Sequence, residues 1–383
     1  MKRLLIFVLT LCLLCSLPVV ALCAEESDAP SVQAKAAVLL EQESGTLLFG
    51  QNEHEKLYPA SVTKVMSLLL FFEALERGDF SLQTTVTASA EAAKKGGSQI
   101  WLKEGEQMRV DELLRATAIG SANDACTALA EALAGSEQGF VRRMNERAKQ
   151  LGMNDTHFDN CTGLDDDTTT HLTSAYDVAL MSRALLSHEK VLDYTTIWMD
   201  ALRGGQTQLV NTNKLVRHYK DTTGLKTGTT SKAGCCISAS AKRGGMHLIA
   251  VILGAENSAD RFAFAQNLLD WGFASFEAVT PEVPQTLLAP LPVQRGKEAV
   301  VLPKMQTLPA LILRRGEKQN LNITADMAEN VEAPVEKGQT LGTLTFSVGD
   351  KQVAKSTLCA ASDVGRLTLF DVFLRLLASL ARR

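Results

Sequence analysis

Three short polar motifs, far apart in the chain, constrain the fold more than any other feature of the sequence. Residues 61–64 are Ser-Val-Thr-Lys, residues 121–123 are Ser-Ala-Asn, and residues 226–228 are Lys-Thr-Gly. Each motif alone is a weak signal, because such short patterns arise by chance in many chains of this length. Their order and their local sequence context favour a fold that brings a helix start, a helix junction and a strand to one site.

The residue types in these motifs fit nucleophilic catalysis by a serine. A serine hydroxyl is a weak nucleophile until a neighbouring base takes its proton. Lys64 follows Ser61 by three residues, so on a helix the two side chains share a face. A lysine is a base only when neutral, and burial beside a second cation such as Lys226 lowers its pKa. Ser121 is a candidate proton relay to the leaving amine, and Asn123 is a candidate to hold a substrate amide and orient the lysine.

Two backbone features complete the predicted site. A helix that starts at Ser61 places a backbone N–H where negative charge develops on an oxyanion. The strand with Lys226, Thr227 and Gly228 is expected at a sheet edge, where the glycine lets a substrate backbone approach and pair as an added strand. Each motif also has an ordinary interpretation as a helix cap, a solvated lysine or a turn. Their joint occurrence in this order favours the catalytic interpretation.

Hydrophobic periodicity predicts mixed α and β structure up to about residue 276. Strands are expected at residues 36–40, 46–49, 223–227, 235–241 and 247–253, and helices at 61–76, 110–133 with an interruption near 120–121, 140–151, 174–187 and 261–273. Residues 90–105 look irregular, and residues 154–172 form a long polar loop of a kind that often carries function. Seven of the ten prolines lie between Pro281 and Pro334 among short β-like runs, which predicts a small all-β domain.

Both ends of the chain predict targeting segments. Residues 1–24 combine Lys2, Arg3, a short apolar run and small residues, which is typical of a secretory signal; a retained membrane anchor is the alternative. Residues 367–383 place Leu and Phe on one helical face and end in two arginines, which favours a helix lying in a membrane surface. A helix docked on its own domain is the alternative. We therefore expect an exported protein at the outer face of the cytoplasmic membrane or in the cell wall.

Charge and cysteine content argue against several classes of protein. The formal net charge is −4 and becomes more negative once two cations leave with the signal, which gives no electrostatic reason to bind nucleic acid. Five of the eight cysteines lie beyond the signal, so at least one thiol stays unpaired. The adjacent Cys235 and Cys236 should point to opposite faces of a strand. No Cys or His spacing matches a zinc site, and we expect neither a metal nor a cofactor.

Longer stretches around the motifs resemble the low-molecular-weight penicillin-binding proteins, the serine D-Ala-D-Ala carboxypeptidases of a peptidase S11-like family. The segments that carry this resemblance are residues 58–66 (Tyr-Pro-Ala-Ser-Val-Thr-Lys-Val-Met), 120–126, 160–164, 173–177, 225–229 and 268–273. The resemblance extends over nearly the whole mature chain. It implies a serine β-lactamase/transpeptidase-like α/β (α+β) catalytic domain at 25–276, a C-terminal all-β domain at 277–365 and an amphipathic membrane-associating helix at 366–383.

The resemblance also implies roles for the residues of the first two motifs. Ser61 would form the acyl-enzyme, and Lys64 would be the general base. Ser121 and Asn123 would act in proton relay and substrate positioning.

The third motif and a later arginine would bind the substrate. Lys226 and Thr227 would support the serine and bind the terminal carboxylate, with Gly228 beside them. The backbone N–H of Thr229 would form the oxyanion hole together with that of the nucleophile. Arg261 matches a family arginine that pairs with the same carboxylate through its guanidinium fork; a helix-surface ion pair is the alternative.

The implied function is removal of the terminal D-Ala from peptidoglycan stem peptides that end in D-Ala-D-Ala, with β-lactam antibiotics as acylating inhibitors. A D,D-endopeptidase would use the same machinery, and the sequence does not separate the two. A β-lactamase shares the fold and motifs, but class A enzymes deacylate with a glutamate, and the 154–172 loop has aspartates and no glutamate. The intact Ser61, Lys64 and Lys226 argue against an inactive β-lactam sensor. Thr229 stands where some members carry histidine, which affects deacylation efficiency rather than the reaction class.

Overall fold

The computed structural model describes residues 29–306 and 310–380. The predicted export signal at residues 1–24 lies outside the described residues. The fold begins with the first strand of a five-stranded antiparallel sheet whose order is β2-β1-β9-β8-β7. Its strands are β1 (Ala36–Glu41), β2 (Leu47–Gln51), β7 (Thr222–Thr230), β8 (Gly234–Arg243) and β9 (Met246–Ala255). The five strands expected from the sequence are therefore present, and the Lys-Thr-Gly motif lies on the edge strand β7 as predicted.

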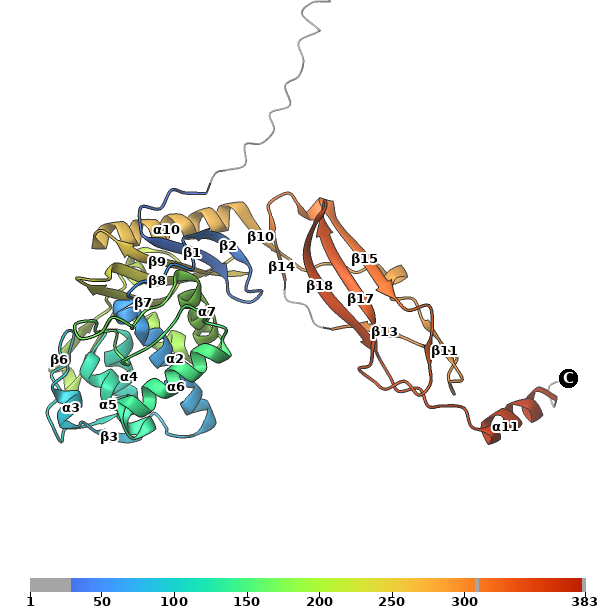
Figure 1. The fold of residues 1–383 in the computed structure, drawn as a ribbon, viewed down its shortest axis with the longest axis horizontal. Coiled ribbons are helices and arrows are strands. Elements are labelled where there is room, and N and C mark those ends of the chain that lie inside the picture. Colours follow the sequence, from blue (N-terminus) through green and yellow to red (C-terminus); the bar gives the residue numbers. More distant parts are fainter. Residues whose placement is uncertain (1–28, 307–309, 381–383) are drawn as a thin grey trace, which may run out of the picture. The chain divides into compact units, whose positions relative to one another are not determined.

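The sheet is covered on both faces, which explains its nearly continuous apolar strands. In β1, Ala36, Val38 and Leu40 pack into one core and the alternate residues Ala37 and Leu39 into another. Helix α10 (Ser258–Ser275) covers the second face, and α2 (Lys64–Arg77) and α7 (Ala175–Leu186) lie on the first (Figure 1). The sheet thus separates a small core from a larger, mostly helical one.

The strand β8 shows the same alternation at its two cysteines. Cys236 lies in the larger core and Cys235 in the smaller one, which confirms that adjacent residues point to opposite faces. All five cysteines among the described residues are free thiols. The sequence predicted at least one unpaired thiol, and the described residues contain five.

Local sequence signals set the helix ends. The Ser136 and Ser174 side chains accept hydrogen bonds from Gly139 N and Asp177 N, and Gly78 ends α2 in a left-handed conformation. The remaining helical segments of this region are η1 (Ala60–Thr63), α3 (Ala90–Ala93), α4 (Val110–Ala118), α5 (Asn123–Ala134), α6 (Glu137–Gln150), η2 (Glu189–Val191), α8 (Leu192–Thr195), η3 (Arg203–Gly205) and α9 (Leu215–His218). Two short two-stranded antiparallel sheets complete it: β3 (Thr85–Thr87) with β4 (Gln107–Arg109), and β5 (Met199–Leu202) with β6 (Thr207–Val210).

Two details differ from the sequence-based expectations. The helical run predicted from residue 61 begins as a 3₁₀ turn, η1, and regular α-helix starts only at Lys64. Within the stretch expected to be irregular, α3 forms one turn, because the Ser89 side chain accepts a hydrogen bond from Ala92 N. The interruption predicted near residues 120–121 is real: α4 ends at Ala118 and α5 starts at Asn123.

Residues 276–366 are rich in strands, as the proline distribution predicted. They form a four-stranded sheet in the order β13-β18-β17-β15, a three-stranded sheet β12-β11-β16 and the pair β10-β14. The strands are β10 (Phe276–Val279), β11 (Leu291–Gln294), β12 (Val300–Val301), β13 (Pro303–Met305), β14 (Leu311–Arg314), β15 (Leu321–Met327), β16 (Val331–Glu332), β17 (Thr340–Val348) and β18 (Lys351–Ala360), with the 3₁₀ turns η4 (Gln285–Leu288) and η5 (Lys318–Asn320). Leu344, Phe346 and Leu358 form the centre of one of its two small cores.

The predicted terminal helix is present as α11 (Leu369–Leu380). It begins with a reciprocal cap, because Thr368 Oγ1 accepts from Asp371 N and the Asp371 carboxylate accepts from Thr368 N. Leu369, Phe370 and Phe373 are 92%, 67% and 55% exposed. Among the described helices, none combines the length and the apolar character that crossing a bilayer requires.

The polar loop at residues 154–172 is fastened to the nucleophile segment through one histidine. His171 Nδ1 accepts a hydrogen bond from Asp159 N at 3.0 Å, so the proton lies on Nε2, which donates to Thr63 Oγ1 at 2.8 Å. Burial lowers the pKa of His171 to about 4. The loop is therefore held by a neutral imidazole.

We expect acid to loosen this attachment. The unfolded chain protonates His171 below pH 6.5, whereas the folded chain resists protonation until about pH 4, so stability falls as the pH drops through that window. The loss at pH 4 is up to ~3 kcal/mol from this residue, at 1.36 kcal/mol per pKa unit. Urea unfolding at pH 7.5 and 4.5 should show a smaller pH-dependent loss for His171→Gln than for wild type. The exposed His218, changed to Gln as a control, should leave the wild-type pH dependence unchanged; an equal loss in all three proteins would contradict this assignment.

Candidate active site

The turn that carries Ser61 is packed closely against two other backbone segments. A Cβ atom on Gly163 would lie 1.8 Å from the Ala60 carbonyl oxygen. A Cβ atom on Gly228 would lie 2.8 Å from both Pro59 O and Ser61 N. Glycine is thus required on both sides of the nucleophile turn. At Gly228 the close neighbour is the protein's own turn, a reason for glycine beyond the predicted approach of a substrate.

Lys64 is fully buried below Ser61 and makes three hydrogen bonds. Its Nζ donates to Ser61 Oγ at 2.9 Å, to Asn123 Oδ1 at 2.5 Å and to the Thr162 carbonyl at 2.8 Å. These acceptors come from three separate segments: η1, the first residue of α5 and the 154–172 loop. Burial lowers the pKa of Lys64 to about 8, so a substantial neutral fraction exists near neutral pH.

The junction between α4 and α5 places Ser121 and Asn123. Ser121 is buried with a left-handed backbone, φ 62°, and its hydroxyl makes no hydrogen bond within the described part of the chain. Asn123 uses both ends of its amide: Oδ1 accepts from Lys64, and Nδ2 donates to Gly96 O at 2.7 Å. The adjacent Asp124 accepts hydrogen bonds from the backbone of the 96–102 loop.

The edge strand β7 supplies a second buried amine. Lys226 is 1% exposed, and its Nζ donates to the Thr227 carbonyl at 2.9 Å. Burial lowers its pKa well below the ordinary value, and the positive charges of Lys64 and Arg261 lower it further. The Thr227 hydroxyl donates to Thr212 Oγ1 at 2.7 Å. The charge of Lys64 thus acts on Lys226, whereas the lowered pKa of Lys64 comes from its burial and not from the second cation that the sequence analysis invoked.

Arg261 reaches β7 from α10. Its Nη1 donates to Gly228 O at 2.9 Å and to Thr229 Oγ1 at 2.8 Å, and its Nη2 donates to Ser258 Oγ at 3.2 Å. The side chain is buried, and the hydrogen bonds that it makes among the described residues go to neutral oxygens, so the alternative of a helix-surface ion pair is wrong. Arg261 is joined to the site through Thr229.

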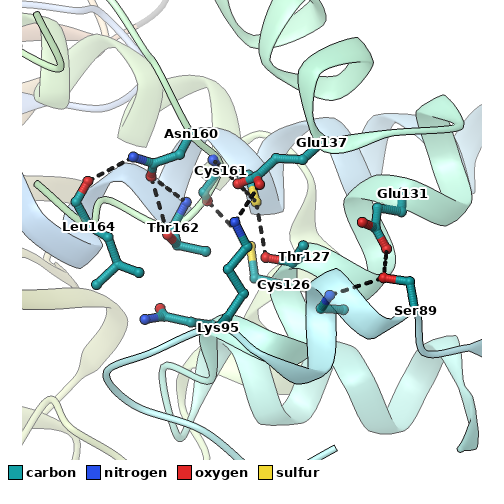
Figure 2. A network of polar contacts seen from close by, with 12 residues as sticks. Ser89, Lys95, Cys126, Thr127, Glu131, Glu137, Asn160, Cys161, Thr162 and Leu164 are labelled. Atoms are coloured by element: carbon teal, nitrogen blue, oxygen red, sulfur yellow. Dashed lines mark hydrogen bonds and ion pairs between the residues drawn. The ribbon is translucent and has the colours of Figure 1, made fainter. Parts of the chain in front are cut away.

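The structure adds contacts that the sequence analysis did not assign. The Asn160 side chain, which lies beside Thr162 in Figure 2, accepts from Thr162 N and Gly163 N. It thereby shapes the turn that offers the Thr162 carbonyl to Lys64. An asparagine followed by Thr-Gly is a turn signal, but the acceptor is a backbone atom, which no sequence pattern identifies. Cys126, one turn beyond Asn123 on α5, is fully buried and donates to the Cys161 carbonyl at 3.3 Å.

A serine within hydrogen-bonding distance of a buried amine, beside a second buried amine on an edge strand, defines the class of serine acyl-transfer enzymes that use lysine as the base. Comparisons with known proteins identify the family. Residues 23–257 match the D-alanyl-D-alanine carboxypeptidase family, and residues 284–366 match the penicillin-binding protein 5 C-terminal domain. The chain belongs to the D-alanyl-D-alanine carboxypeptidase family, and it is a serine-type enzyme of that family.

Individual relatives support this membership over most of the chain. The D-alanyl-D-alanine carboxypeptidase DacF of Bacillus subtilis is 39% identical over 336 residues, which cover 87% of this chain and 86% of the relative. The crystal structure of penicillin-binding protein 5 from Haemophilus influenzae is 28% identical, with a TM-score of 0.80 over 88% of this chain and 99% of that one. Penicillin-binding protein D2 from Listeria monocytogenes, solved in its cefotaxime-bound form, is 31% identical with a TM-score of 0.59, over 64% of this chain and 99% of that one.

The close approach at Gly228 gives a testable prediction. In Gly228→Ala, the new methyl would meet Pro59 O and Ser61 N, so β7 must move away from the nucleophile turn. We expect the acylation rate with a fluorescent penicillin to fall by at least about tenfold, because small misplacements in a reacting geometry cost that much. Gly50→Ala on β2 is the control, because its methyl meets only the flexible end of Glu53. Wild-type acylation by Gly228→Ala would contradict the proposed packing.

Proposed function

We propose that this chain removes the terminal D-Ala from cell-wall peptides that end in D-Ala-D-Ala, through an acyl-enzyme on Ser61. The observation that carries the proposal is the 2.9 Å hydrogen bond between Lys64 Nζ and Ser61 Oγ in a buried site. Burial holds the pKa of this lysine near 8, so the amine can lose its proton and become a base.

In the first step, Ser61 Oγ attacks the carbonyl carbon of the penultimate D-Ala while neutral Lys64 takes the hydroxyl proton. The C–N bond to the terminal D-Ala then breaks, and the leaving nitrogen receives a proton through Ser121, whose hydroxyl is free to turn between donor and acceptor. Water then attacks the ester carbonyl and gives a proton to the lysine. The bond between the acyl carbon and Ser61 Oγ breaks, and the lysine returns the proton to Oγ, which restores both groups. The products are the shortened peptide and one D-Ala.

The remaining residues would bind and stabilise the substrate. The backbone N–H groups of Ser61 and Thr229 would donate to the developing oxyanion. Lys226 and Thr227 would hold the terminal carboxylate at the edge of β7, where Gly228 leaves room for an extended peptide. Arg261 would add positive charge there and orient the hydroxyl of Thr229, to which it donates at 2.8 Å.

β-Lactams would acylate the same serine. Penicillin-binding protein D2 of Listeria monocytogenes, which matches the catalytic part of this chain, was solved with cefotaxime bound. We propose that the Ser61 ester of a β-lactam forms by the same attack and hydrolyses slowly. In this proposal residues 25–276 catalyse, residues 277–365 form the β-rich domain, and residues 366–383 associate with the membrane after export.

Replacement of the nucleophile tests this assignment directly. Ser61→Ala should take up no fluorescent penicillin and release no D-Ala from diacetyl-Lys-D-Ala-D-Ala, because among the described residues no other hydroxyl receives a hydrogen bond from Lys64. Ser187→Ala, at an exposed serine that bonds only the backbone of its own helix turn, should retain both activities. Mass spectrometry should place the wild-type adduct on Ser61. Covalent labelling of Ser61→Ala would exclude this mechanism, and fast, steady nitrocefin turnover by wild type would favour a β-lactamase. Cleavage of crosslinked muropeptides in preference to the tripeptide would favour a D,D-endopeptidase.

The exposed apolar face of α11 supports the membrane assignment. We expect the mature chain to co-sediment with vesicles that contain anionic lipid, because exposed Leu369, Phe370 and Phe373 would bury in the lipid interface near the basic C-terminus. The double variant Phe370→Ser, Phe373→Ser keeps the charge and should stay in the supernatant while acylating at the wild-type rate. Equal sedimentation of the two proteins would show that α11 does not bind the membrane.

A further inference from the structure

An ion pair beside the site has no part in the reaction described above. Lys95, in the loop after α3, and Glu137, the first residue of α6, meet at 2.5 Å between Nζ and Oε2 (Figure 2). The two side chains are only 23% and 15% exposed. Burial by itself lowers the pKa of Lys95, but the hydrogen bond and the charge of Glu137 raise it overall. The pair is therefore a fixed pair of opposite charges rather than a mobile surface contact.

The glutamate end of the pair holds the loop that faces Lys64. Glu137 Oε1 accepts from both Cys161 N and Cys161 Sγ at 3.3 Å. The next residue, Thr162, offers its carbonyl to Lys64 Nζ at 2.8 Å. One carboxylate oxygen thus fixes the residue directly before one acceptor of the catalytic amine.

The lysine end reaches a second acceptor in the same way. Gly96 follows Lys95 directly, and its carbonyl accepts from Asn123 Nδ2 at 2.7 Å. The other end of that amide, Oδ1, accepts from Lys64 at 2.5 Å. Two of the three acceptors of Lys64 are therefore each connected to one end of this ion pair.

We propose that Lys95 and Glu137 are positioning residues that hold the 94–98 and 160–164 loops at the separation at which Lys64 meets Ser61. This inference rests on the proposed role of Lys64 as the base. The positive and negative charges of the pair also balance each other. Loss of either partner leaves one uncompensated charge, negative or positive, in the loops that contact Lys64 and Asn123.

Because the two partners carry opposite charges, the two single variants should shift the pH dependence of acylation in opposite directions. In Lys95→Met the unpaired Glu137 favours the protonated form of Lys64, so the rise of acylation rate with pH should move to higher pH. In Glu137→Gln the amide still accepts from Cys161 N, but the unpaired Lys95 cation disfavours protonation, so the rise should move to lower pH. The other titratable groups that face Lys64 are not substituted in either variant: Lys226 on β7, Asp124 and Cys126 on α5, and Cys161 and His171 in the 154–172 loop. Of these, the Cys161 thiol loses its charged acceptor in Glu137→Gln and keeps it in Lys95→Met.

The experiment measures the second-order rate of acylation by a fluorescent penicillin from pH 6 to 10 on the full mature chain. Wild type should rise through pH about 8. Each single variant should also lose about tenfold in its plateau rate, because the loops are no longer held in place. The double variant Lys95→Met, Glu137→Gln should recover the wild-type pH dependence, since no charge is left unpaired, but keep the low plateau.

A matched control separates positioning from general stability. Arg147 and Glu73 form a comparable ion pair, at 2.8 Å and 29% and 15% exposed, that lies outside the contacts of Lys64. Glu73→Gln should lower the melting temperature about as much as Glu137→Gln does and leave the pH profile of acylation unchanged. If the pH dependence of acylation moved in the same direction in both single variants, or in neither, the positioning role would be overturned. The proposed function would still stand in that case, provided that the wild type is acylated on Ser61. A wild type that is not acylated on Ser61 would overturn both.

Discussion

The buried amine of Lys64 sets the requirements for the rest of the catalytic domain. An ammonium group without water around it is costly unless hydrogen-bond acceptors replace the water, and an unsatisfied buried polar group costs about 1–3 kcal/mol. Here the acceptors are Ser61 Oγ, Asn123 Oδ1 and the Thr162 carbonyl, from three different segments. The same contacts that make burial tolerable also aim the amine at the hydroxyl. Stability and reactivity of this site therefore depend on one set of distances.

Much of the architecture followed from local sequence patterns. Alternation and apolar runs predicted the five strands of the main sheet, and Gly120-Ser121 predicted the break between α4 and α5. The 3₁₀ turn at Ser61 was not predicted, because it arises where β7 and the 160–164 loop press against the turn through Gly228 and Gly163. The single turn α3 was missed because its cap, Ser89, stands in a stretch without helical periodicity.

The sequence predicted the side chains that meet in the site better than it predicted the backbone and ion-pair contacts that hold them in place. The order of three motifs predicted that Ser61, Lys64 and Asn123 would meet, and the structure brings them together. Residue identity says little about a backbone carbonyl, so the part played by Thr162 became visible only in three dimensions. The same holds for Lys95 and Glu137, which are ordinary charged residues in sequence and adjacent only after the loops fold. The catalytic roles themselves remain predictions.

The strands β7 and β9 come late in the chain, so the surroundings of Ser61 form late in synthesis. The first strand, β1, pairs with β9, and the turn of Ser61 is completed only when Gly228 of β7 packs against it. During synthesis Ser61 emerges long before either strand, and contacts between residues so distant in sequence form slowly. A nascent or truncated chain would thus carry Ser61 without the contact with β7 that completes its turn. Catalytic activity would therefore require the last strands of the sheet, and an incompletely synthesised molecule would not react with cell-wall peptides.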